Sequence, residues 1–338
     1  MCNANCTDIN NHNREKHFKV QVAAIASIPI FSSFSSAWGQ QQSVAVGNLR
    51  SRKCKSIARI ISGDLRLANF SELCEQDQLQ PDRDKGTVEV LCYLSGEILR
   101  LSGGIISNQC LPPSDQPVQR CSSEIRSNCL KVKGPDEDNN APTRITPYSA
   151  LILNPRPVML WTPVHSAISY IVQIKGTGVD WSIEVNSNSL PYPKEQPAMQ
   201  PGSIYQVNVL AKIGEQKFVP SSSILMVIPS EKEQHIKAVM KYIQNLNLSP
   251  DDLAVDSAHI YRANDLLTEA IEVLNKRIKA KTQNPTIYRT LGDLYLEVGL
   301  PQMANREYNT AIQYARLKRN LNELAKAEEG LRLTRDKT

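Results

Sequence analysis

Residues 288–311, YRTLGDLYLEVGLPQMANREYNTA, form the most informative stretch of this chain. Several of its positions are matched by similar residues 34 places earlier, as Tyr261 matches Tyr295 and Ala270 matches Ala304. A self-similarity of this period is typical of helix pairs that stack on their neighbours. Stacked helix pairs usually build binding surfaces, so the stretch predicts a helical array with a binding role.

The repeated unit has aromatic, glycine and small residues at fixed intervals, namely Tyr288, Leu291, Gly292, Tyr295, Gly299, Ala304, Tyr308 and Ala311. This spacing resembles the tetratricopeptide repeat, in which two helices approach closely through the small residues. Pro301, shortly after Gly299, predicts a helix end followed by a new helix start. Ser257 and Arg277 in the preceding unit depart from the family pattern. An ordinary helical bundle with accidental periodicity is the alternative.

Helical periodicity continues on both sides of these two units. Apolar residues recur at helical spacing over residues 231–248, which predicts an amphipathic helix that caps the array, since two units alone are marginal. Residues 321–331 are expected to form one closing helix. Asp251 and Asp252 follow a Ser-Pro pair at an expected helix start, where negative charge is favoured. Tetratricopeptide-like helical repeats are therefore expected over residues 230–338.

A second pattern, of short strands, occupies residues 150–229. Residues 157–163 carry Trp161 in an apolar run, and apolar and polar residues alternate at 167–174, as in a half-buried strand. The most specific piece is MQPGSIY at residues 199–205. It resembles a corner of fibronectin type III domains, where a tyrosine hydroxyl bonds to nearby backbone, and Tyr205 stands at that position. The resemblance implies an immunoglobulin-like β-sandwich.

Aromatic residues of this middle region are expected to be structural. Trp161 lies on the early strand of the family pattern, and Tyr205 on the corner. Trp181 and Tyr192 are expected in core or edge packing, with a sugar-stacking patch as the alternative reading.

Residues 40–130 carry strand signals of a smaller domain. Strands are expected at 56–63 and 87–94, followed by a turn at 95–97 and a return strand from residue 98. The pattern loosely resembles the small β domain of FecR-type periplasmic proteins. A small cystine-stapled β module is the alternative. Polar, breaker-rich residues predict a linker at 131–149.

Cysteine distribution predicts disulfides in the smaller domain. Of eight cysteines two lie in the first six residues, and the other six are Cys54, Cys74, Cys92, Cys110, Cys121 and Cys129. An even set confined to one region is typical of an oxidising compartment. No C-x2-C pair occurs, so zinc and other metals are not expected. Neighbouring cysteines are the favoured pairs, Cys92 with Cys110 across a hairpin and Cys121 with Cys129.

Residues 1–39 have the features of a signal peptide. Basic residues precede an apolar stretch at 20–34, and the small residues Ala37 and Gly39 suit cleavage before Gln40. Export to the periplasm or outside the cell is therefore expected, with no transmembrane segment in the mature chain. A cytoplasmic chain with an apolar leader is the alternative.

Composition and motifs argue against several classes of function. The formal charge of +5 over 338 residues is small, and no basic cluster is interleaved with aromatics, so nucleic acid binding is not expected. Sequence motifs of metalloproteases, serine hydrolases and nucleotide-binding loops do not occur. His165, His235 and His259 stand in scattered contexts. We therefore expect a protein that is not an enzyme and needs no cofactor.

These features together predict a multidomain, exported, non-catalytic interaction or scaffold protein of a bacterial envelope, with an architecture that resembles cyanobacterial envelope proteins. The repeat resemblance implies a peptide-binding groove on the first helix of each pair, at His259, Arg262, Arg289, Asp293 and Glu297. Its arginines suit an acidic peptide, because guanidinium groups pair with carboxylates. Solvation or ion pairing with Asp293 and Glu297 is the alternative for these arginines.

Two other functions fit the sequence. One is an envelope signalling or regulatory protein that uses the FecR-like module as a sensor. The other is contact with the cell wall or a polysaccharide through the sandwich.

Overall fold

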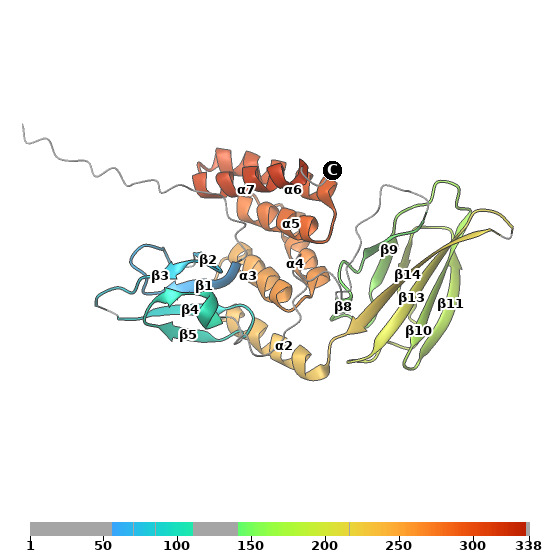
Figure 1. Ribbon diagram of the computed structural model, residues 1–338, viewed down its shortest axis with the longest axis horizontal. Helices are drawn as coiled ribbons and strands as arrows, with labels where there is room; N and C mark the ends of the chain where they lie inside the picture. Colours follow the sequence, from blue (N-terminus) through green and yellow to red (C-terminus); the bar gives the residue numbers. More distant parts are fainter. Residues whose placement is uncertain (1–55, 70, 85, 111–140, 216, 336–338) are drawn as a thin grey trace, which may run out of the picture. The chain divides into compact units, whose positions relative to one another are not determined.

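The computed structural model describes residues 56–69, 71–84, 86–110, 141–215 and 217–335. Helices and strands are labelled in Figure 1. Strands precede the long helices along the chain, and the strands divide into an N-terminal set and a middle set separated by residues 111–140. The expected order of β regions followed by C-terminal helices is therefore confirmed.

The N-terminal strands form a four-stranded antiparallel sheet in the order β2-β1-β4-β5. Its members are β1 (Ser56–Ser62), β2 (Glu72–Cys74), β4 (Val88–Cys92) and β5 (Ile98–Leu101). Two short strands, β3 (Gln78–Leu79) and β6 (Gly104–Ile105), pair separately. The strands expected at 56–63 and 87–94 and the return strand from residue 98 are confirmed.

Strand β4 has apolar residues on both of its faces. Val88, Val90 and Cys92 pack in the core of the N-terminal sheet. Leu91, and Tyr93 just after the strand, belong instead to a cluster with residues of the helices. Because alternate residues of a strand point to opposite faces, the sheet is buried on its second face by the helices.

Cys92 forms a disulfide with Cys110, as expected. Cys110 lies in the short helix α1 (Ser107–Cys110), after the β4–β5 hairpin and not on it. Cys74 is also disulfide-bonded. Cys54, Cys121 and Cys129 lie outside the described residues, so the expected Cys121–Cys129 pair stays a prediction. The leader at residues 1–39 lies outside them too.

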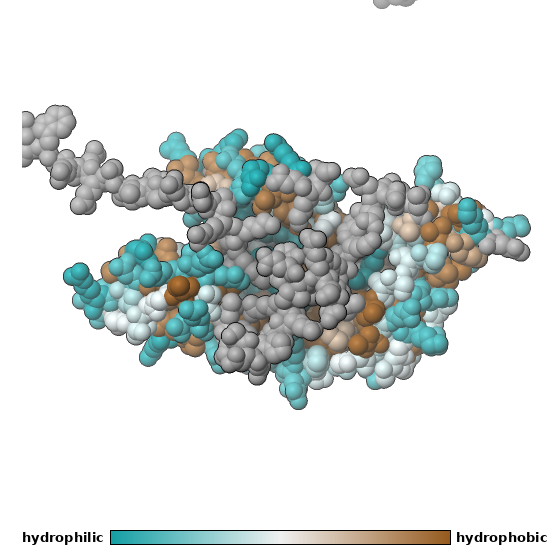
Figure 2. Space-filling model, viewed as in Figure 1, coloured by the Kyte–Doolittle hydropathy of each residue, from teal (hydrophilic) through white to brown (hydrophobic). Residues whose placement is uncertain are grey.

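The middle strands form two sheets around one apolar core. The larger sheet has the order β11-β10-β13-β14-β8 and the smaller one β12-β9-β7. In the view of Figure 2, teal and white residues cover much of this region with brown patches between them, as expected for strands with one solvated face. The larger sheet contains β8 (Leu151–Ile152), β10 (Ser169–Gly176), β11 (Val179–Val185), β13 (Ile204–Lys212) and β14 (Phe218–Val227), and the smaller one β7 (Arg144–Thr146), β9 (Val158–Trp161) and β12 (Ser189–Pro191).

The aromatic residues of the middle region have the expected structural roles. The Tyr205 hydroxyl accepts a hydrogen bond from the Gln200 backbone at 2.7 Å and donates one to the Thr177 carbonyl at 3.0 Å. Trp161 is 1% exposed in the core. Trp181 packs edge-on against Tyr192 and is buried as well. Neither ring of that pair is open to a sugar.

The segment expected as a linker is partly a strand. Arg144–Thr146 form β7, which pairs with β9 at the edge of the smaller sheet. The described part of residues 131–149 therefore adds a strand to the middle region. The composition of this segment indicated a linker because Pro and Ser residues lie on either side of a strand of only three residues.

Among the described residues, six helices follow the middle strands, and helices that follow one another from α3 to α7 pack together. The helix expected over 231–248 ends earlier, at Gln244, and the closing helix expected over 321–331 extends to Arg335. None of the described helices is long and apolar enough to cross a membrane. The six are α2 (Ser230–Gln244), α3 (Pro250–Ala263), α4 (Leu267–Lys279), α5 (Pro285–Glu297), α6 (Pro301–Leu317) and α7 (Leu321–Arg335).

Helix ends follow the signals in the sequence. The Ser249 hydroxyl caps α3, which carries Asp251 and Asp252 in its first turn. Pro301 begins α6 directly after the turn at Gly299, whose φ of 78° favours glycine. These signals set where the helices begin, and hence which side chains share a face.

Close packing of α5, α6 and α7 depends on two glycines. A Cβ atom on Gly292 would lie 2.7 Å from the ring of Tyr308, and one on Gly330 would lie 2.3 Å from it. Tyr308 is buried between them, at 1% exposure. The small residue at 292 thus lets the helices approach, as the repeat pattern predicts.

Candidate functional site

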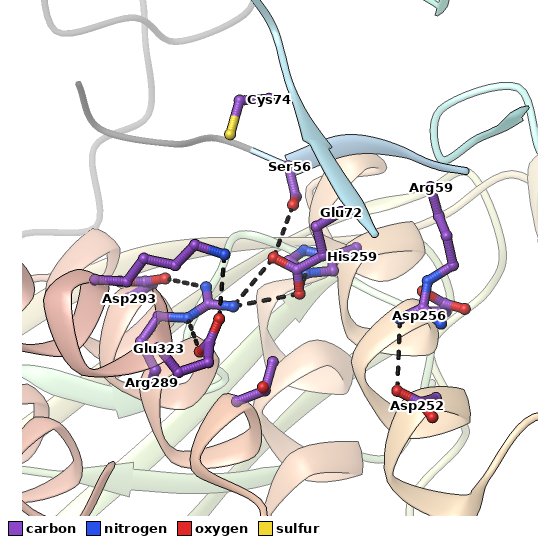
Figure 3. A network of polar contacts seen from close by, with 12 residues as sticks. Ser56, Arg59, Glu72, Cys74, Asp252, Asp256, His259, Arg289, Asp293 and Glu323 are labelled. Atoms are coloured by element: carbon purple, nitrogen blue, oxygen red, sulfur yellow. Dashed lines mark hydrogen bonds and ion pairs between the residues drawn. The ribbon is translucent and has the colours of Figure 1, made fainter. Parts of the chain in front are cut away.

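The most unusual site in the described chain is a set of buried charged side chains between the N-terminal sheet and helices α3, α5 and α7 (Figure 3). We call it the Arg289 cluster. It consists of Glu72 on β2, His259 on α3, Arg289 and Asp293 on α5, and Glu323 on α7.

Arg289 lies at the centre of the cluster and binds three carboxylates. Its Nη2 donates to both oxygens of Glu72, at 3.2 and 3.1 Å. Its Nη1 donates to Asp293 and its Nε to Glu323, each at 2.9 Å. The side chains of Arg289, Glu72 and Glu323 are 6%, 9% and 8% exposed. Every nitrogen of the guanidinium therefore has a carboxylate partner; two of these carboxylates are buried, and that of Asp293 is 26% exposed.

Glu72 also contacts two polar side chains other than Arg289. The Ser56 hydroxyl donates to its Oε2 at 3.1 Å, and His259 Nε2 lies 3.4 Å from its Oε1. Burial acts to raise the pKa of Glu72, but the attraction of Arg289, followed by His259, outweighs burial and holds that pKa well below its usual range. The Glu72 carboxylate is therefore charged when it is docked.

The side chain of His259 is buried where α3 faces the N-terminal sheet. Its ring stacks on Tyr93 with centroids 5.1 Å apart. Burial lowers the pKa of His259, against the opposite influence of Glu72. A neutral imidazole can donate one hydrogen bond and accept one, so it is a neutral partner for the Glu72 carboxylate.

A second buried pair lies beside the Arg289 cluster. Arg59 of β1 places its Nε 2.7 Å from Oδ1 of Asp256 on α3, although the angle is not that of a hydrogen bond. The Tyr93 hydroxyl donates to the same oxygen at 2.8 Å. Burial raises the pKa of Asp256 to about 7, although Arg59 and Tyr93 both favour the charged form. This pair joins the sheet to α3 where the Arg289 cluster joins it to α5 and α7.

The structure brings together only part of the expected groove. His259, Arg289 and Asp293 meet in one cluster, whereas Arg262 pairs with Glu297 at 2.6 Å outside it. The ion pairs that the sequence left as an alternative, Arg289 with Asp293 and Arg262 with Glu297, are both present. Binding of a peptide by these residues stays a prediction.

Sequence reasoning missed the residues that complete the site. Glu72 lies 217 residues before Arg289, and Tyr93 lies 163 residues before Asp256. Arg59 and Glu323 were missed as well. A single charged residue on a strand or helix is normally solvated, so no pattern within the sequence distinguishes these four.

Polar groups of the Arg289 cluster converge on the carboxylate of Glu72. Arg289 Nη2, His259 Nε2 and the Ser56 hydroxyl surround its two oxygens, and the guanidinium reaches both of them through Nη2 alone. Within the described residues, no group of three or more His, Cys, Asp or Glu side chains is placed to hold a metal ion.

The outer face of the larger middle sheet offers a weaker candidate. It has a shallow, open depression, and all of the residues that line it are uncharged. They are Gln173, Asn208, Leu210, Pro220, Ser221 and Ser222.

Comparison with known proteins adds no assignment to this geometry: no protein-family model matches the chain, and no curated protein sequence matches it.

Proposed function

We propose that this protein is an exported, non-catalytic interaction or scaffold protein of a bacterial envelope that binds an acidic peptide segment through α3, α5 and α7. The observation that carries the proposal is the placement of Arg289, with His259 beside it, around a carboxylate. The carboxylate in the structure is Glu72, which donor atoms contact on both oxygens. A face that accepts this group has the chemistry to accept one from another protein.

The finer description of the helices belongs to the same proposal. We infer that α3 to α6 are tetratricopeptide-like repeats with α7 as the closing helix. Support comes from the alternation of helices, since α3, α5 and α7 supply the Arg289 cluster while α4 and α6 do not. The contact between Gly292 and Tyr308 is further support.

The β regions have proposed identities as well. We infer a fibronectin type III-like sandwich in the middle region, supported by the Tyr205 corner and the shared core of its two sheets. The FecR-like reading of the N-terminal sheet rests on the sequence resemblance. Export is supported by the Cys92–Cys110 disulfide, because such bridges persist in oxidising compartments.

Peptide binding can be tested on the full mature chain with an array of acidic peptides and their Glu→Gln, Asp→Asn counterparts. We expect acidic peptides to bind at least about tenfold more tightly, because a charged carboxylate binds the buried guanidinium more strongly than a neutral amide does. The variant Arg289→Lys keeps the charge and loses the fork, so the preference should fall.

Arg316→Lys is the matched control, since Arg316 lies on α6 and its pair with Glu328 is exposed. It should leave the peptide preference unchanged. Equal binding of acidic and amide peptides by the wild-type chain and the Glu72→Gln variant would remove the proposed function.

A further inference from the structure

One of the three carboxylates in the Arg289 cluster, that of Glu72, comes from an edge strand. Glu72 begins β2, the outermost strand of the order β2-β1-β4-β5. An edge strand is an extended segment with one side of its backbone free of pairing within the sheet. The N-terminal sheet therefore presents to the helices what an extended acidic peptide would present.

The helices satisfy two of the three guanidinium nitrogens of Arg289 without this strand. Asp293 and Glu323, both on helices, each bind one nitrogen of the guanidinium, and Lys326 binds Glu323 at 3.1 Å. Two cations thus face two helical carboxylates. Glu72 adds a third negative charge beside a histidine whose pKa is lowered by burial. The helices should therefore keep their structure when Glu72 leaves.

Polar groups at this contact are incompletely matched. Among the described residues, Asp256 Oδ2, Arg59 Nη1 and His259 Nδ1 are buried without a hydrogen-bond partner. A buried polar atom that lacks a partner costs free energy that water would restore on opening. The polar part of the contact is therefore less stable than its number of ion pairs suggests.

Apolar contact holds the sheet at a different strand. Leu91 and Tyr93, at the end of β4, pack with Val239, Ile243 and Ile260 of the helices. The carboxylate comes from β2, on the other side of β1. The β2 edge can therefore separate from α5 while β4 keeps its apolar contact.

We propose that Glu72 is an internal ligand that occupies the carboxylate-binding face of the helices, and that an extended acidic peptide of a partner protein binds by displacing it. This inference rests on the proposed function, because it concerns the regulation of the same face. In the closed state the face is unavailable, and the apparent affinity for the partner is reduced by the fraction of molecules that are open.

The first test measures separation of the β2 edge from the helices in the absence of a partner protein. Diethyl pyrocarbonate modifies accessible histidines, and His259 is buried whereas His165 and His235 are exposed. In Glu72→Gln, modification of His259 followed by mass spectrometry should be at least about tenfold faster than in the wild-type chain, because one buried charge of the contact is lost. His165 and His235 should react at unchanged rates in both proteins.

Glu75→Gln is the matched control, since it removes a carboxylate from the same segment outside the Arg289 cluster. It should leave the rate at His259 unchanged. An unchanged rate at His259 in Glu72→Gln would overturn the inference that Glu72 closes the face.

The second test measures binding of a probe taken from the chain itself. A fluorescent peptide of residues 69–77 carrying Cys74→Ser should bind Glu72→Gln at least about tenfold more tightly than the wild-type chain. The same peptide with Glu72→Gln should bind neither. If His259 is modified faster in Glu72→Gln but the peptide does not bind, Glu72 closes the face and the peptide-binding function is wrong. The failure of the inference and the failure of the proposed function are therefore distinguishable.

Discussion

The N-terminal sheet and the middle β region contact the same helices by different chemistry. Beside the apolar contact of Leu91 and Tyr93, the sheet uses buried pairs of charged side chains, Glu72 with Arg289 and Arg59 with Asp256. The middle region uses its backbone, whose Leu153 N–H donates to a glutamate of α4 and whose Tyr148 N–H donates to a threonine of the same helix. Apolar residues around Ile228 complete that second contact.

The difference indicates which contact depends on particular side chains. A buried ion pair loses its partner when either residue changes, and the remaining charge is then left in a dry site. A backbone donor is present whatever side chain its residue carries, so the contact of the middle region tolerates more substitution. The N-terminal contact is therefore the one that a single residue can open or close.

The largest effect is expected for Arg289→Met. Removal of the guanidinium leaves Glu72, Asp293 and Glu323 facing one another in a buried site. We expect the free energy of unfolding in urea to fall by roughly 3–5 kcal/mol, because breaking a buried pair leaves an uncompensated charge. Arg316→Met should cost under about 1 kcal/mol, since that pair is exposed. Equal losses would contradict the distinction.

The next largest effect concerns the turn between β4 and β5. Gly96 has a φ of 72°, and a Cβ atom there would lie 2.1 Å from Val239 Cγ2 on α2. Gly96→Ala should therefore lower the free energy of unfolding through strain and overpacking. Gly86 has a φ of 63° with no atom within 4 Å of such a Cβ, so Gly86→Ala carries the backbone strain alone.

The difference between the two alanine variants measures the contact with α2. We expect Gly96→Ala to be the less stable by roughly 1–3 kcal/mol in urea unfolding, the usual cost of overpacking. Equal stability would mean that the turn and α2 adapt without cost.

Protonation of Asp256 gives a smaller, pH-dependent effect. Burial raises the pKa of Asp256 from 3.8 to about 7, so the folded state binds a proton more tightly than the unfolded state. This stabilisation is fully present below about pH 4 and is lost as pH rises towards 7. Glu72 acts in the opposite sense, because its pKa is lower in the folded state than the unfolded value of 4.5. Its contribution to stability is fully present above about pH 4.5 and is lost as the pH falls.

Asp256→Asn isolates the first of these effects. Between pH 5 and pH 6 the stability of the wild-type chain relative to the variant should fall by about 1 kcal/mol, near the limit for one titrating group. Urea unfolding at a series of pH values measures the difference. A constant difference over this range would show that Asp256 stays charged beside Arg59.

The smallest effect is expected on the other side of the comparison. Glu269→Ala removes the acceptor that lies 2.7 Å from the Leu153 N–H. The apolar cluster around Ile228 remains, so we expect a loss of roughly 1 kcal/mol, the usual net value of one hydrogen bond. Glu272→Ala, at an exposed position of the same helix, should change stability by less than about 0.5 kcal/mol. A loss of stability in Glu269→Ala as large as that in Arg289→Met would contradict the difference between the two contacts.

Local structure was largely predictable from the sequence. The Tyr205 corner, the helix start at Pro301 and the close approach at Gly292 follow from residues that act within one or two turns of the chain. The pairing of Cys92 with Cys110 was also expected from their proximity in sequence. Strand β7 was missed because three residues between Pro and Ser carry too little periodicity to be recognised.

The binding chemistry was predictable only in part. Helical spacing placed Arg289 and Asp293 on one face of α5, because residues four apart in a helix are neighbours. The repeat resemblance placed His259 on the same side of the array, 34 residues before Asp293. Neither could show that Glu72 docks against them, since a lone glutamate at a strand end has the same appearance whether it is solvated or buried.

Residues close in sequence were enough to place the long helices and the main strands, because periodicity, caps and small residues act over short distances. The contact of Glu72 on the β2 edge with Arg289 and His259 appears only when the chain is folded. The physical reason is that charged side chains have no intrinsic preference for one distant partner. Packing of the sheet against the helices excludes water between them, and that exclusion turns separate surface charges into the Arg289 cluster.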